Sequence, residues 1–229
     1  MKMRGIKYWG KIWGETEGII LLVTLFLYLF TGMDFEFLGK DGVTESILSL
    51  LAWYLVIAGA FVTFVITVSC FQQYLPMAVA FGATRKNAAA GALLLGPASC
   101  TDTLAAAALL WILAGDDVAR AGLHLLGALA GGLLAVNGIG VLFGVAVLRF
   151  KRAAFVLMFM GLLVGAGGGI AWSILVGGKL EGRVTDLAQS LVRTGNPAAG
   201  LMFAAAGAGI YLLFSLLALG LTRKIEVRL

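Results

Sequence analysis

The sequence predicts an all-α protein with six membrane-spanning helices. Of its residues, 61% are hydrophobic and 13% charged, with a mean hydropathy of +1.00, whereas soluble domains have about 45–50% apolar and about 25% charged residues. Apolar runs recur along the whole chain, and about 20 residues of helix cross a hydrocarbon layer of about 30 Å. These runs are continuous and do not alternate as barrel strands do. We therefore expect a polytopic membrane protein with one transmembrane domain over residues 1–229, and a soluble enzyme is excluded.

Hydropathy sets the expected elements in order. The spans are expected at about residues 18–33, 47–71, 88–115, 125–148, 153–176 and 197–221. An amphipathic outer helix is expected over residues 184–191, where apolar side chains recur at helical spacing.

Residues 1–17 carry a basic, partly apolar pattern. Met3, Ile6, Trp9 and Trp13 recur at roughly helical spacing between lysines and an arginine, which predicts an amphipathic helix on the cytoplasmic face of the membrane. The alternative is that these residues simply extend the first span. No small-residue cleavage site follows the first span, so we expect it to be retained.

Basic residues orient the spans. Twelve of the seventeen lysines and arginines fall in the N-terminus, the second and fourth loops and the C-terminus. The positive-inside rule then places both termini in the cytoplasm. Because the basic clusters lie between apolar runs, we expect them to meet lipid headgroups, and no nucleic-acid partner is expected.

The second inner loop, residues 72–87, is polar at both ends but keeps apolar residues at helical spacing. We expect a short cytoplasmic helix after a proline turn at Pro76, ended by Gly82. The basic tip at Arg85 and Lys86 suits docking on a polar or acidic partner groove.

This loop resembles that of permease subunits of ATP-binding-cassette (ABC) transporters of the type-2 exporter class, which include bacterial drug and antimicrobial-peptide exporters. Many of them carry the pattern Pro-x-Ala-x-x-x-Gly-x-Thr/Ser-Arg-Lys between spans two and three. The matching residues here are Pro76, Ala78, Gly82, Thr84, Arg85 and Lys86. Chain length, six spans, cytoplasmic termini and a basic amphipathic start also agree with the family.

The resemblance implies an ATP-driven exporter in the bacterial cytoplasmic membrane. It implies two cytosolic ABC ATPase subunits that bind ATP and Mg, a second permease subunit in a homo- or heterodimer, and an amphipathic peptide, drug or lipid as substrate. The loop would be the coupling helix that docks on the ATPase, through Pro76, Met77, Ala78, Phe81, Gly82, Ala83, Thr84, Arg85 and Lys86. The alternative is a helix end followed by an ordinary positive-inside signal.

The chain itself carries no enzyme motif. It has no Gly-x-x-x-x-Gly-Lys-Ser/Thr sequence, no Gly-x-Ser-x-Gly and no His-Glu-x-x-His. Its one histidine and two cysteines form no metal-ligand spacing. We therefore expect no cofactor or metal on this chain and no ATP hydrolysis by it.

Two polar residues stand out within the spans. Asp102 lies sixteen residues beyond Lys86, about 24 Å along a helix, where an ionised side chain costs about 2.5–3.5 kcal/mol on insertion scales. It is either part of a substrate or proton pathway or a structural carboxyl group bonded to a neighbour such as Asn137 or Ser173. Pro97 is expected to bend this span and to free backbone carbonyl groups near Ser99, Thr101 and Thr103.

Glycines recur every four residues in two spans, and such faces let helix backbones approach closely. Packing within the chain is the simpler expectation, and a subunit interface is the alternative. The residues are Gly140 and Gly144 in the fourth span and Gly161, Gly165 and Gly169 in the fifth.

Two other functions compete with export. A substrate-binding subunit of a vitamin or metal uptake system is also a small six-span protein, and Ala107 and Trp111 faintly match a spacing known in that group. A membrane scaffold or sensor needs only the hydropathy and the glycine packing. The substrate is not determined by any of these patterns.

Overall fold

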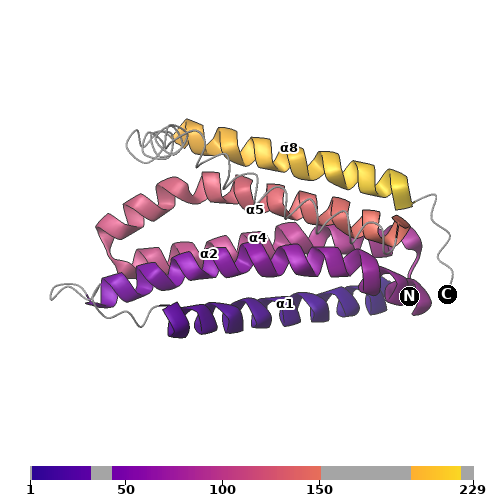
Figure 1. The fold of residues 1–229 in the computed structure, drawn as a ribbon, viewed down its shortest axis with the longest axis horizontal. Helices are drawn as coiled ribbons and strands as arrows, with labels where there is room; N and C mark the ends of the chain where they lie inside the picture. Colours follow the sequence, from indigo (N-terminus) through magenta and orange to yellow (C-terminus); the bar gives the residue numbers. More distant parts are fainter. Residues whose placement is uncertain (1, 32–42, 151–196, 223–229) are drawn as a thin grey trace, which may run out of the picture.

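The computed structural model describes residues 2–31, 43–150 and 197–222 (Figure 1). Within these ranges every element is helical, and no strand occurs. The elements are α1 (Lys2–Thr31), α2 (Val43–Ser69), the π-helix η2 (Cys70–Tyr74), α3 (Leu75–Ala80), α4 (Arg85–Ala114), α5 (Asp116–Phe150) and α8 (Pro197–Thr222).

Five of the described helices are long and apolar enough to cross a membrane. They correspond to the expected spans one, two, three, four and six. The expected span over residues 153–176 and the outer helix over 184–191 lie outside the described residues. Gly115, whose φ is 121°, ends α4, and α5 begins at the next residue. Residues 116–124, which lie between the expected third and fourth spans, are therefore helical and do not form a loop.

Residues 2–31 form one uninterrupted helix. The separate interfacial helix expected over residues 1–17 is therefore not present, and the basic start extends the first span, whose apolar part runs over Lys7–Phe30. The physical reason is that Ile12, Thr16 and Ile20 on this helix are buried against the neighbouring helices, so the interface continues through the stretch that looked amphipathic.

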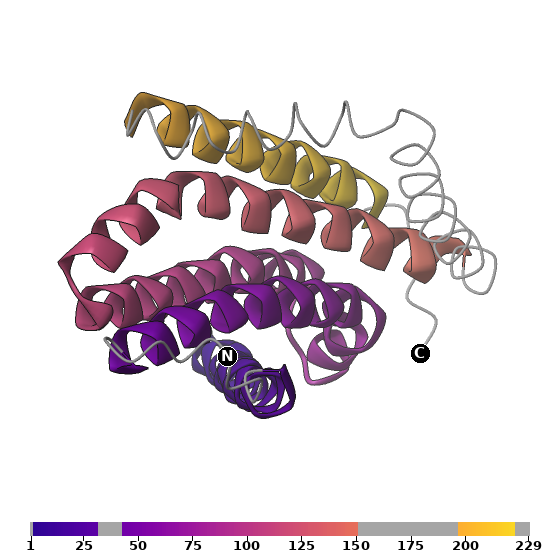
Figure 2. The same ribbon diagram turned by 60° about the vertical axis from the view of Figure 1, so that its left-hand side comes forward.

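Helices α2, α4 and α5 pack against one another in the middle of the bundle (Figures 1 and 2). Helix α1 lies along α2 and α4, and α8 lies along α5 on the other side (Figure 2). Helices α1 and α4 begin at one end of the bundle, where α2, α5 and α8 finish (Figure 1).

The core consists of two apolar clusters with a polar layer between them. One cluster includes Phe71 and Leu75, and the other includes Leu55 and Trp111. Between the clusters, at mid-helix, lie buried polar side chains from four helices: Thr16 of α1, Thr63 and Thr67 of α2, Ser99 and Thr103 of α4, and Asn137 of α5.

Glycines bring α5 and α8 into backbone contact. A Cβ atom on Gly131 would collide with the backbone of Phe203, and one on Gly207 would collide with the backbone of Gly131. Likewise, a Cβ on Gly127 would collide with the backbone of Gly200. Small residues at these positions therefore set how closely the two helices pack.

Pro97 has a consequence different from the one expected. Because it lacks an N–H, it leaves the carbonyl four residues earlier, that of Leu93, without its helical donor. The Tyr211 hydroxyl of α8 donates to that Leu93 oxygen. Near the expected positions, the Thr101 hydroxyl donates to the Pro97 carbonyl at 2.8 Å, as an ordinary bond to residue i−4.

Candidate functional site

The segment between α2 and α4 begins without the proline turn we expected. Helix α2 continues into η2, where the Leu75 N–H donates to the Cys70 carbonyl five residues earlier. Pro76 then lies in the first turn of α3, a position that needs no N–H donor. Since Pro76 cannot bond residue 72, the wider π turn accommodates it while the helical path continues.

Gly82 ends α3, as the sequence predicts. Its φ of 87° is a conformation that favours glycine. The Gly82 N–H donates to the Val79 carbonyl at 2.9 Å and the Ala83 N–H to the Ala78 carbonyl at 3.0 Å, which is the hydrogen-bond pattern of a Schellman motif.

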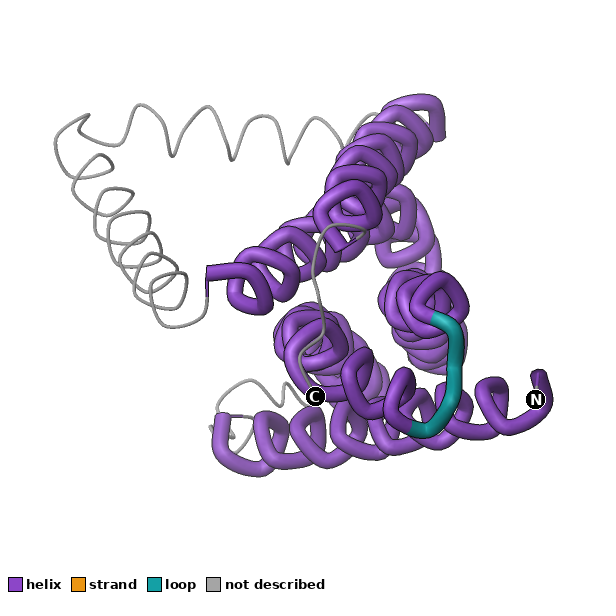
Figure 3. Tube along the Cα trace, turned by 90° about the vertical axis from the view of Figure 1, so that its right-hand side faces the viewer, coloured by secondary structure: helices purple, strands orange, loops and turns teal. Residues whose placement is uncertain are grey.

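Helix α4 then starts with a side-chain cap. Thr84 has an extended conformation, and its Oγ1 accepts from the Asn87 N–H at 3.4 Å. Only the four residues 81–84 separate the two helices, and they form the loop in Figure 3. The connection from α3 to α4 is therefore short and capped on both sides.

Apolar side chains project from this end of the bundle. Phe81 is 76% exposed and Met77 is 50% exposed, whereas Leu75 and Ala78 of the same short helix are buried in the core. Lys86, in the first turn of α4, is also exposed. The segment thus holds one face in the core and presents Met77, Phe81 and Lys86 outward.

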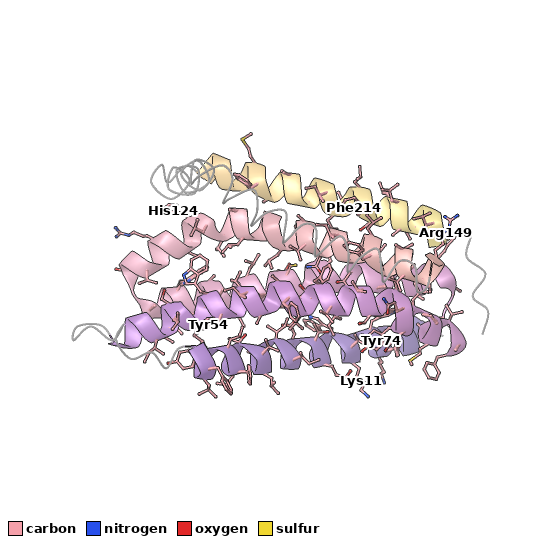
Figure 4. The ribbon with its side chains drawn as sticks, viewed as in Figure 1. Lys11, Tyr54, Tyr74, His124, Arg149 and Phe214 are labelled. Carbon is pink, nitrogen blue, oxygen red and sulfur yellow. The ribbon has the colours of Figure 1, made fainter. Side chains whose placement is uncertain are left out.

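The N-terminal part of α1 contacts the same segment. The Tyr8 hydroxyl donates to the Tyr74 carbonyl at 3.3 Å, and the Tyr8 and Phe81 rings lie with centroids 6.3 Å apart. Figure 4 places Tyr74 at the end of the bundle that also carries Arg149, and His124 at the opposite end. Sequence reasoning missed the contact with α1, because nothing in the local pattern pairs residue 8 with residue 74.

Asn137 is completely buried and joins three helices. The two hydrogens of its Nδ2 have three acceptors within reach: Thr63 Oγ1 of α2 at 3.1 Å, Cys100 Sγ of α4 at 3.1 Å and the Leu133 carbonyl at 2.9 Å. Its Oδ1 accepts from Thr67 Oγ1 of α2 at 2.8 Å. Asn137 is thus the centre of a hydrogen-bonded network that fixes the positions of α2, α4 and α5 relative to one another.

Asp102 lies outside that network. Its Oδ2 accepts a hydrogen bond from the Trp13 indole N–H of α1 at 2.9 Å. Cys100, which contacts Asn137, is two residues away and therefore about 200° around α4. The two candidate polar residues consequently serve different interfaces, and Asn137 is not the partner that Asp102 bonds. Ser173, the other partner considered, lies outside the described residues.

Glu17 is the polar residue that sequence reasoning missed. It interacts electrostatically with Asp102, and Ser99 of α4 lies within reach of its carboxyl group. Neither Glu17 Oε1 nor Ser99 Oγ has a hydrogen-bond partner in the described part of the chain. The sequence did show an acidic residue ten positions into the apolar stretch Lys7–Phe30. Because the first span was expected to start at residue 18, Glu17 was not counted among the polar residues within the spans.

Of the glycines expected to pack helices, Gly140 faces α2, and Gly144 faces the junction of α2 and η2. A Cβ on Gly140 would lie 3.2 Å from the Phe64 ring, and one on Gly144 would lie 3.0 Å from Phe71. Gly161, Gly165 and Gly169 lie outside the described residues. Glycines that contact other helices most closely, such as Gly131 and Gly207, carried no expectation, because small residues occur throughout the chain.

Among the described residues, no three His, Cys, Asp or Glu side chains gather as a metal site would require. Comparison with models of known protein families, with curated proteins and with solved structures finds no match for this chain.

Proposed function

We propose that this chain is the membrane-spanning permease subunit of an ABC exporter, and that segment 76–86 docks on a cytosolic ATPase. The observation that carries the proposal is the outward position of Phe81 and Met77 at the end of a membrane bundle. These two apolar side chains are exposed, while the short helix that carries them is anchored in the core and capped at its end. Exposed apolar side chains on such an ordered segment are typical of a protein-binding site. The resemblance of residues 76–86 to the exporter motif supports an ABC ATPase as the partner.

The distribution of charge supports the orientation that this proposal needs. The basic residues of the described part lie mostly at the end that carries the segment, where α1 and α4 begin and α5 finishes: Lys2, Arg4, Lys7, Lys11, Arg85, Lys86 and Arg149. The opposite end carries Asp116, Asp117 and Arg120. By the positive-inside rule the segment then faces the cytoplasm, together with both termini, in a bacterial cytoplasmic membrane.

The geometry also supplies a route for coupling. Segment 76–86 continues from α2 through η2 and leads within a few residues into α4, and α1 contacts it through Tyr8. Closure of two ATPases on ATP and Mg would therefore pull on three spans at once. In a pair of such permeases, tilting these spans switches access for an amphipathic peptide, drug or lipid substrate.

Phe81→Ala tests the docking role, with Phe61→Ala as a matched control. Phe61 is 67% exposed on the lipid-facing side of α2, so both changes remove an exposed ring without opening the core. Affinity purification of each tagged chain in mild detergent, with mass spectrometry of what accompanies it, provides the measurement. We expect a protein with nucleotide-binding motifs, in stoichiometric amount, with the original chain and Phe61→Ala, and a loss of at least tenfold with Phe81→Ala.

Two results would contradict the proposal. A chain that purifies without any nucleotide-binding protein favours an uptake subunit with a retained small ligand or a scaffold. An ATPase retained equally by Phe81→Ala and Phe61→Ala removes the docking role from this segment. Equal yield and equal thermal midpoints of the two variants show that folding is not the cause of any difference.

A further inference from the structure

Two carboxyl groups lie half-buried on the flank of the bundle, away from the proposed docking segment. Glu17 is about 15 Å along α1 from Lys7 and about 20 Å from Phe30, the limits of its apolar stretch. Asp102 is about 24 Å along α4 from Lys86 and about 18 Å from Ala114, the limits of the next one. Both acids therefore lie at membrane depth on helices that pack against each other.

The two acids differ in their hydrogen-bond donors. Asp102 Oδ2 accepts from the Trp13 indole N–H at 2.9 Å, a contact that stabilises a carboxylate. Glu17 Oε1 makes no hydrogen bond among the described residues, and the donor within its reach is the neutral Ser99 hydroxyl. The hydrogen bond that favours a carboxylate is thus made by Asp102 and not by Glu17.

Buried hydroxyl groups beside the acids also lack partners in the described ranges. Ser99 is 1% exposed and within reach of the Glu17 carboxyl group, and its Oγ makes no hydrogen bond. Thr103, one turn further along α4, is 2% exposed, and its Oγ1 makes none either. Buried oxygens without hydrogen-bond partners are costly, and the Ser99 hydroxyl is the group placed to donate to the Glu17 carboxyl group.

In the part of the structure described, no basic side chain forms an ion pair with Glu17 or Asp102. Lys11, the basic residue of α1 nearest to them in sequence, pairs with Glu15 at 3.7 Å, and both side chains are largely exposed; Lys11 points away from the bundle (Figure 4). The other titratable group close to Glu17 is Cys100 of α4.

The helices packed around the pair add no counter-charge at this depth. On α2, the ionisable residues are Glu45 and Tyr54, in the first half of the helix, while Gly59 packs against Thr103. On α5, the ionisable residues lie in its first turns and at Arg149. A like charge nearby disfavours ionisation, so the pair favours a state in which one acid is neutral.

We propose that Glu17 binds a proton within the membrane, with Asp102 as its negatively charged neighbour. The proton on Glu17 removes one of the two like charges. A metal cation fits less well, because the Trp13 N–H directs its positive end at Asp102 Oδ2. Both acids are half-buried, so reagents can reach them from the flank of the bundle.

Dicyclohexylcarbodiimide, an apolar reagent that attacks protonated carboxyl groups in apolar surroundings, tests this assignment. The full chain in lipid vesicles is treated near neutral pH, and labelled peptides are located by mass spectrometry. We expect labelling at Glu17 and at least tenfold less at the exposed Glu15, two residues away on the same helix. Asp102→Asn removes the neighbouring negative charge, so the labelling of Glu17 is expected to fall off at lower pH than in the original chain.

Other outcomes overturn the proposal. Equal labelling of Glu17 and Glu15, or none at Glu17, means that Glu17 holds no proton near neutral pH. Protection of Glu17 by excess NaCl, but not by the same concentration of N-methylglucamine chloride, means that the acids bind a metal cation instead. The unmodified chain provides the decisive result, so no variant needs to fold for the test to count.

Discussion

Pro97 and Tyr211 form a pair in which one residue compensates for the other. Pro97 removes a backbone donor from α4, and the Tyr211 hydroxyl donates to the Leu93 carbonyl that is left without it. The hydroxyl thereby ties α8 to α4, and the compensation predicts that the effects of replacing the two residues are not additive.

A double-mutant cycle measures this coupling. Tyr211→Phe is expected to lower the free energy of unfolding by about 1–2 kcal/mol, because the Leu93 oxygen is left unpaired in the core. In a Pro97→Ala background the restored backbone N–H serves that oxygen, so Tyr211→Phe is expected to cost about 1 kcal/mol less. Unfolding by sodium dodecyl sulfate in mixed micelles gives the four values. Equal costs in both backgrounds would mean that the hydroxyl does not replace the missing donor.

At the scale of elements, the position of α8 depends on glycine contacts with α5. Gly131 and Gly132 are adjacent in α5, but a Cβ on Gly131 would collide with the Phe203 backbone, whereas one on Gly132 meets nothing within 4 Å. The neighbouring positions therefore form a matched pair with the same helix propensity.

Gly131→Val is expected to destabilise the bundle by about 1–3 kcal/mol relative to Gly132→Val, because α5 and α8 must move apart. The same micelle unfolding experiment supplies the comparison, and limited proteolysis reports whether α8 is released first. Equal stabilities of the two variants would show that α5 and α8 do not touch at Gly131.

Which elements form was predictable from sequence, and which residues meet was less so. Continuous apolar runs indicated each of the five described long helices, and the φ of Gly82 matches the predicted end of the short one. The start of α1 was misjudged, because polar residues such as Glu17 interrupt a stretch that is nonetheless buried along one face. Hydropathy averages over a window and does not register which face carries an acid.

Which side chains form hydrogen bonds with each other could not be predicted from local sequence patterns. Asp102 bonds Trp13, which is 89 residues away in sequence, and Asn137 bonds residues of two other helices. Such pairs depend on the rotation and depth of each helix, which small differences in packing determine. Likewise, 32 glycines along the chain offer more small-residue faces than the bundle has close contacts.

At the scale of the whole molecule, the two ends of the bundle should lie on opposite sides of the membrane. Phe81, at the end of α3, and His124, near the start of α5, are both exposed and belong to opposite ends of the bundle. With Phe81→Cys and His124→Cys, a membrane-impermeant maleimide applied to intact cells is expected to label position 124, and to label position 81 only after permeabilisation. Cys70 and Cys100 are buried, so the unmodified chain serves as a low-background control. Labelling of position 81 in intact cells would invert the orientation.

The hydrogen bond from the Tyr8 hydroxyl to the Tyr74 carbonyl links the start of α1 to the segment between α2 and α4. A helix is stiff over a few turns, and Glu17 follows Tyr8 by about 14 Å along the same rod. If segment 76–86 docks on an ATPase as proposed, a push on Phe81, whose ring neighbours that of Tyr8, is expected to displace Glu17 relative to Ser99 and Asp102. Such a movement of α1 would change the distances from the Glu17 carboxyl group to the Ser99 hydroxyl and to the Asp102 carboxyl group.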